Sequence, residues 1–73
     1  DDIQMVANGD AYAFVSSTDS PIRVSVYAMN GADVASSAGV GIVNLNIGHL
    51  GRGVYIVKAM GAKGSHVFKI LKK

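Results

Sequence analysis

Few side chains in this 73-residue sequence could act as acids, bases, nucleophiles or metal ligands. The imidazoles are His49, in a glycine-rich stretch, and His66, at the start of the last apolar segment. A metal site such as that for zinc needs at least three suitably placed ligands and an oriented second shell. The sequence contains no Cys, and the spacing of the two histidines suggests no third ligand. We therefore expect no metal site.

The carboxylates are equally poor candidates for catalysis. The chain has no Glu, and its acidic residues are Asp1, Asp2, Asp10, Asp19 and Asp33. The last three fall in or beside predicted turns, where Asp is favoured because its side chain bonds to nearby backbone. A catalytic carboxylate pair needs a cleft that separates the two pKa values, and a chain this short has little room for one. No G-x-S-x-G sequence supports a Ser–His–Asp triad, so we expect no catalytic residue and no enzymatic activity.

Two glycine-rich stretches suggest phosphate binding but lack the rest of the motif. Residues 39–41 (GVG) are not followed by the third glycine of a dinucleotide fingerprint, because Asn44 stands there. Residues 48–53 (GHLGRG) lack the Lys-Ser/Thr of a P-loop and precede a predicted strand instead of a helix. We interpret these as turn glycines and expect no cofactor.

The remaining pattern is that of short strands. Residues 22–29 (IRVSVYAM) alternate apolar and other side chains with period two, which is typical of a half-buried strand. Asn30-Gly31 follows, and both residues tolerate the positive φ of a type I′ turn, so the chain is predicted to return along residues 33–37. Further strands are predicted at residues 3–7, 11–17, 43–47, 54–60 and 65–71, with loops at 36–41 and 48–53.

This spacing indicates the fold class. No stretch of helical length shows a 3.6-residue period, and six or seven short strands separated by turns favour an all-β, small antiparallel immunoglobulin-like β-sandwich. A small open barrel is the alternative architecture. A domain of this size buries only about 60% of its unfolded surface, so the single core is thin.

Charge and hydropathy argue against a nucleic-acid-binding protein and against a membrane-spanning one. The formal net charge is +2, and four lysines lie in the last eleven residues, but no aromatic residues interleave with them as a nucleic-acid stacking surface requires. No apolar run approaches the roughly 20 residues of a transmembrane helix. Asp1-Asp2 is the opposite of the basic start of a signal peptide. We expect a soluble chain that binds no nucleic acid and does not insert into membranes.

The strand at residues 54–60 is apolar on both sides. Its alternation places Tyr55, Val57 and Ala59 on one side and Val54, Ile56 and Met60 on the other. A small sandwich buries only one of these sides in its own core. The spare side either docks on a neighbouring domain or partner, or forms ordinary surface partly covered by Lys stems.

Three segments, in order, resemble a known family. Residues 26–31 (VYAMNG) resemble the V-Y-[DN]-M-x-G hairpin of the C-terminal sorting domain of type IX (Por) secretion cargo from Bacteroidetes. Residues 47–58 (IGHLGRGVYIVK) resemble its L-x-x-L-x-x-G-x-Y-x-[VL]-[KR] segment, and residues 69–73 (KILKK) its terminal K-[VIL]-[VIL]-x-K strand. The resemblance covers about residues 21–73. It departs from the family at Ala28, at Gly51 in place of a Pro, and in the absent N-terminal Asn-Pro strand, which suggests truncation at Asp1.

The resemblance implies a function. Such domains are seven-stranded immunoglobulin-like sandwiches at the end of larger secreted proteins. The type IX machinery recognises them and carries the cargo across the outer membrane. A sortase-like surface protease then removes them, and the cargo is joined to anionic lipopolysaccharide. Residues 1–73 would thus be one C-terminal sorting domain excised from a larger secreted protein. Its partners would be the secretion machinery, the protease and an N-terminal cargo domain of the same chain. It would end at the cell surface after transient passage through periplasm and outer membrane.

The same resemblance assigns roles to residues. The last strand and tail are predicted to carry recognition: Lys69, Ile70, Leu71, Lys72 and Lys73. A second set is predicted to support the fold: Val26, Tyr27, Met29, Asn30, Gly31, Gly53 and Tyr55. The lysines also have a structural interpretation, because charges on an edge strand protect it against aggregation, and the two roles can coexist.

The competing hypothesis is an immunoglobulin-like surface module that binds glycan or protein, or that spaces other domains. A glycan-binding face would normally show exposed aromatic rings with polar neighbours. Tyr12 and Tyr27 are the only candidates, and at least one of them is expected in the core. Such a module would tolerate residues added after Lys73, whereas a sorting signal read at the C-terminus should not.

Overall fold

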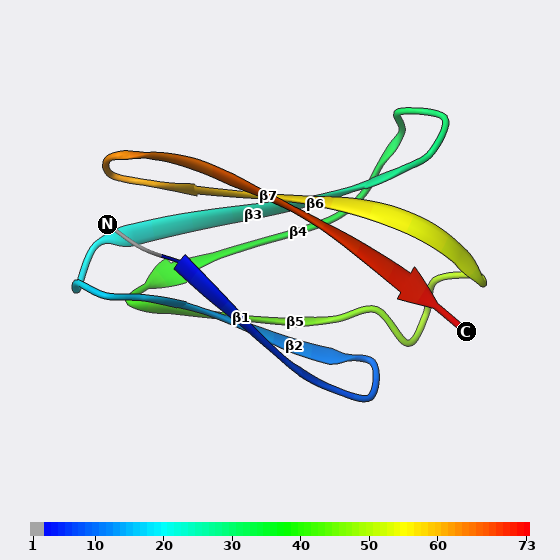
Figure 1. Ribbon diagram of the computed structural model, residues 1–73, viewed down its shortest axis with the longest axis horizontal. Coiled ribbons are helices and arrows are strands. Elements are labelled where there is room, and N and C mark those ends of the chain that lie inside the picture. The colour runs from blue at the N-terminus through cyan, green and yellow to red at the C-terminus, as the bar shows by residue number, and fades with distance from the viewer. Residues whose placement is uncertain (1–2) are drawn as a thin grey trace.

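The computed structural model describes residues 3–73, which form seven strands in two antiparallel sheets (Figure 1). The strands are β1 (Ile3–Asn8), β2 (Ala11–Ser16), β3 (Pro21–Ala28), β4 (Asp33–Val40), β5 (Ile42–Asn46), β6 (Gly53–Gly61) and β7 (Gly64–Lys72). The small sheet has the order β1-β2-β5 and the large sheet the order β4-β3-β6-β7. The predicted all-β antiparallel sandwich is confirmed. The predicted boundary at Asp1 lies outside the described residues.

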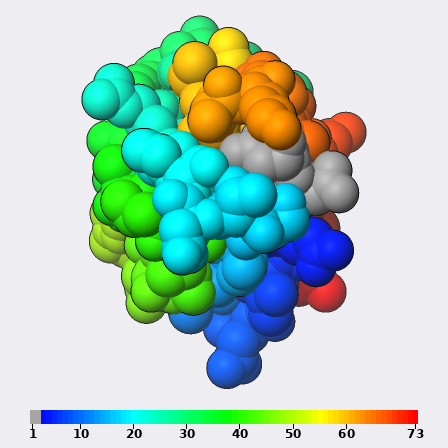
Figure 2. Space-filling view, turned by 90° about the vertical axis from the view of Figure 1, so that its left-hand side faces the viewer, coloured from blue at the N-terminus to red at the C-terminus, as the bar shows by residue number. Residues whose placement is uncertain are grey.

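The core lies between the two sheets because alternate side chains of each strand point inward. Its members are Ile3, Tyr12, Phe14, Ile22, Val24, Val26, Val43, Leu45, Ile47, Tyr55, Val57, Ala59 and Ile70. Phe14 of the small sheet is fully buried, and its ring centroid lies 5.7 Å from that of Phe68 on β7. Leu50, in the loop between β5 and β6, packs against the core at one end of the sandwich. Figure 2 shows the opposite end of the sandwich, where the cyan segment around the start of β3 crosses the middle.

The hairpin between β3 and β4 forms as predicted, but its turn is not of type I′. Gly31 N–H donates to the Ala28 carbonyl over 2.9 Å, and Ala28 N–H donates to the Ala32 carbonyl over 2.9 Å. Gly31 has φ +89°, whereas no described residue other than glycine has positive φ. Asn30 instead accepts a 3.0 Å hydrogen bond from Ala32 N–H through its side-chain oxygen. The result is a three-residue loop with glycine in the left-handed position, the other common hairpin connection.

Residues 36–41 were predicted as a loop, and that prediction was wrong. Most of this segment belongs to β4, which pairs with β3 from Pro21 opposite Val40 onward. Small residues carry a weak strand signal of their own, so the pairing with β3 decides the conformation. The chain then bends at Gly41, whose N–H donates to the Ser20 carbonyl and whose carbonyl accepts from Ser16 N–H. This bend carries the chain from the large sheet into β5 of the small sheet.

Membrane-spanning helices are not found in residues 3–73, since no helix there is long and apolar enough to cross a bilayer.

Candidate recognition site at the C-terminal strand

Strand β7 forms one edge of the large sheet. It pairs with β6 along its whole length, from Gly61 opposite Gly64 to Gly53 opposite Lys72, and no other strand in the described part of the chain continues the sheet beyond it. In Figure 1 it is the red arrow that leads to the C-terminus. The edge of a sheet presents backbone donors and acceptors on which a further strand can pair. The strand that the family resemblance singled out is therefore accessible to a partner strand.

Alternation along β7 divides the five predicted recognition residues into two sets. Lys69 and Leu71 point outward, with Leu71 58% exposed, and Lys73 is exposed just beyond the strand. Ile70 points inward, is 5% exposed and stands opposite Tyr55. Lys72 shares the inward side with Ile70 because residues two apart face the same side of a strand. Only the outward set is placed to meet a partner.

Lys72 joins the two sheets. Its Nζ lies 3.3 Å from Asp10 Oδ2, and its side chain is 12% exposed against 49% for Asp10. Asp10 lies in the turn between β1 and β2, and its carbonyl also accepts a hydrogen bond from Ile47 N–H over 2.9 Å. The ion pair thus fixes the end of the edge strand to the hairpin of the small sheet. Sequence analysis missed this contact, although the alternation Phe68, Ile70, Lys72 already places Lys72 on the core side.

Replacing Lys72 with Gln should lower the free energy of unfolding by about 0.5–1 kcal/mol, because half-exposed ion pairs contribute that much. Lys69→Gln removes the same charge from the outward side and should change stability by less than about 0.5 kcal/mol. Urea unfolding of both variants, and of Asp10→Asn with and without Lys72→Gln, measures the coupling. Equal losses for Lys69→Gln and Lys72→Gln, with no coupling to Asp10, would contradict this role.

The residues predicted to support the fold have different surroundings. Val26 is fully buried opposite Val57. Tyr55 is buried, and its hydroxyl donates to the Gly51 carbonyl over 2.7 Å, which ties the loop before β6 to the sheet. Gly53 has φ +149°, a conformation that other residues rarely adopt.

Two members of that set contribute less to the core. Tyr27 is half-buried on the outward side of β3, opposite Ile56. Met29 is 68% exposed in the hairpin loop. The other aromatic side chains are buried or half-buried too, including Tyr12 at 8% exposure. Residues 3–73 therefore offer no exposed aromatic ring of the kind that a glycan-binding face uses.

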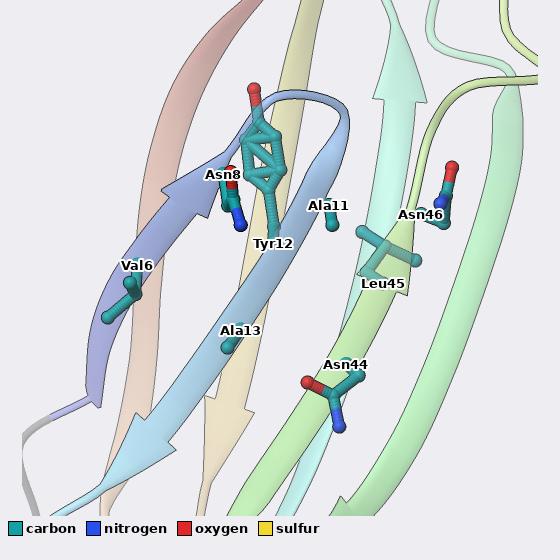
Figure 3. A pocket seen from close by; sticks show the side chains of 8 residues that line it. All are labelled: Val6, Asn8, Ala11, Tyr12, Ala13, Asn44, Leu45 and Asn46. Atoms are coloured by element: carbon teal, nitrogen blue, oxygen red, sulfur yellow. The ribbon is translucent and has the colours of Figure 1, made fainter.

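A hollow of about 420 Å³ lies on the small sheet (Figure 3). Its lining comes from β1, β2 and β5: Val6, Asn8, Ala11, Tyr12, Ala13, Asn44, Leu45 and Asn46. Amides and small apolar groups line it, and the only ionisable one is the buried Tyr12. Within the described residues no group of three or more His, Cys, Asp or Glu side chains could hold a metal ion. This hollow has no set of groups for acid–base or metal chemistry.

Comparison with known families identifies the family of this chain. The model of a family described as "secretion system C-terminal sorting domain" matches residues 8–73. The chain belongs to this family. The match begins before residue 21, so it includes β2 as well as the three segments that carry the resemblance. No curated protein matches the chain.

Membership in this family makes the domain a type IX secretion sorting signal. A sorting domain is a signal and is not itself a catalyst. Its partners are, in general terms, the type IX secretion system and a cargo protein, and the cargo is secreted or displayed at the cell surface.

Proposed function

We propose that this domain directs an N-terminal cargo of the same chain across the outer membrane, and that the machinery reads the edge of β7 and the tail. The supporting observation is the position of β7 at a sheet edge, with Lys69, Leu71 and Lys73 on its accessible side. An edge strand is a template for a partner strand, whose backbone bonds give affinity while alternate side chains give selectivity.

The inward residues have a different part in this proposal. Ile70 anchors the strand in the core and Lys72 holds its end against Asp10. The edge strand is therefore held in a fixed position before binding. It loses less conformational entropy when a partner binds than a flexible strand would.

The later steps also belong to the proposal. After export, a sortase-like surface protease removes the domain, and the cargo is joined to anionic lipopolysaccharide. The domain passes only transiently through periplasm and outer membrane. Residues 3–73 pack around a core of their own, which supports removal of the domain as one unit.

A reporter fusion tests the role of the outward side. Leu71→Glu should reduce the surface-exposed fraction of the reporter by about tenfold, the effect expected of one lost contact of about 1.4 kcal/mol. Val40→Glu is the matched control, since Val40 is 64% exposed and lies on β4, the other edge of the same sheet. It should change the fraction by less than about twofold. Equal effects of the two variants would refute recognition at β7.

A further inference from the structure

The outward side of the β6–β7 hairpin alternates apolar and cationic side chains. Across the two strands Lys58 stands opposite Val67, and Ile56 stands opposite Lys69. Three apolar side chains on this side are strongly exposed: Met60 at 47%, Val67 at 65% and Leu71 at 58%. We name this surface the hairpin face, and its residues are Val54, Ile56, Lys58, Met60, Ser65, Val67, Lys69 and Leu71.

The charge of the hairpin face is uniformly positive. All five acidic residues of the sequence lie at or before Asp33, whereas six of the seven basic residues follow it. Lys72 is turned inward and paired with Asp10. Lys58 and Lys69 lie on the face itself, and Lys63 and Lys73 lie at its two ends. No carboxylate of β6 or β7 competes for these cations, so the surface favours an anionic partner.

The residue types distinguish between two kinds of anionic partner. Protein–protein interfaces are enriched in aromatic residues and Arg and depleted in Lys. The hairpin face itself carries lysines and aliphatic side chains, and the one aromatic ring that borders it, Tyr27 of β3 opposite Ile56, is half-buried, with Arg23 opposite Met60. A lysine stem can lie along an apolar surface while its ammonium group reaches out to dispersed phosphates. This combination suits a lipid surface better than a protein groove.

We infer that the hairpin face binds the surface of a membrane that contains anionic phospholipids. The two strands lie along the membrane plane, Met60, Val67 and Leu71 contact the boundary between headgroups and acyl chains, and Lys58 and Lys69 bind phosphate groups. Each lysine near an anionic surface strengthens binding only modestly, so binding is weak, reversible and peripheral. The surface shares Lys69 and Leu71 with the proposed sorting site, but lipid binding requires no secretion machinery.

Co-sedimentation of the 73-residue chain with vesicles tests this inference. The chain should bind vesicles of phosphatidylcholine with about 30% phosphatidylglycerol, should not bind pure phosphatidylcholine, and should be released by about 0.5 M NaCl. Lys69→Gln should weaken binding about fivefold and Lys58→Gln/Lys69→Gln about thirtyfold. Arg52→Gln, with the same net charge as Lys69→Gln but a position in the loop before β6, should weaken it less than about twofold.

Two matched valine variants test the contribution of apolar side chains to vesicle binding. Val67→Ser should weaken vesicle binding by about threefold or more, because it removes apolar surface from the contact. Val6→Ser alters a similarly exposed valine, at 57%, on the small sheet and should leave binding unchanged. Circular dichroism confirms that each variant is folded.

Two outcomes would overturn the inference. One is equal binding to both kinds of vesicle, and the other is an equal loss from Arg52→Gln and Lys69→Gln. Capture of an acidic protein by the hairpin face, without vesicle binding, would assign the surface to a protein partner instead. Because the vesicle assay contains no secretion machinery, a negative result leaves the sorting function intact, and failure of sorting leaves lipid binding intact.

Discussion

Replacing the outward-facing residues of the last strand with glutamates should abolish surface delivery of a fused reporter while the domain stays folded. The variant is Lys69→Glu/Leu71→Glu/Lys73→Glu, which leaves the inward Ile70 and Lys72 in place. If each of the three lost contacts is worth about tenfold, surface delivery should fall by about a thousandfold. The reporter should accumulate in the periplasm, and protease accessibility of intact cells measures its location.

A simple deletion of residues 70–73 is a less selective version of this experiment. It removes Ile70, which is 5% exposed, and the Lys72–Asp10 ion pair along with the outward side chains. Loss of delivery by the deletion alone would therefore not separate recognition from folding. The triple variant does separate them, and its delivery at the level of the unaltered domain would contradict recognition at β7.

Phe14→Ala should remove most of the free energy of unfolding of the domain. Phe14 is fully buried and its ring packs against Phe68 of the opposite sheet. Truncating a buried Phe to Ala costs about 3–5 kcal/mol, and the total stability of a domain this small is at the low end of about 5–15 kcal/mol. Circular dichroism and urea unfolding measure the loss.

The neighbouring residue gives the control for that prediction. Val15 follows Phe14 on β2 but is 38% exposed on the other side of the sheet. Val15→Ala should cost less than about 1 kcal/mol. Phe14→Leu should recover part of the stability, because it keeps most of the buried volume. Similar losses for Phe14→Ala and Val15→Ala would contradict the position of the core.

Most of the fold followed from period-two alternation. The strand that ends in the Asn30-Gly31 hairpin was placed correctly because Ile22, Val24 and Val26 alternate with other side chains. Residues 36–41 were misassigned because Ser, Ala and Gly have little strand preference of their own. There the partner strand β3 supplies what the local sequence lacks. The type of the turn depended on φ at Asn30, which residue identity alone did not determine.

The candidate site was predicted less completely. Family motifs indicated the segment of residues 69–73 but treated its side chains as one set. The structure separates them, since Lys72 pairs with Asp10 from a distant part of the sequence. A contact of this kind depends on how two sheets pack, and no local pattern in the sequence records it. The alternation of side chains along β7 could have predicted which of residues 69–73 face inward and which face outward.

The most direct test of the sorting function compares two strains. A neutral reporter fused ahead of the 73-residue chain is expressed in a type IX-competent bacterium and in the same strain with the secretion system disabled. We expect the reporter at the cell surface in the competent strain and in the periplasm of the disabled one. A reporter that stays in the periplasm of both strains, with the domain folded, would contradict the proposal that this domain directs its cargo across the outer membrane.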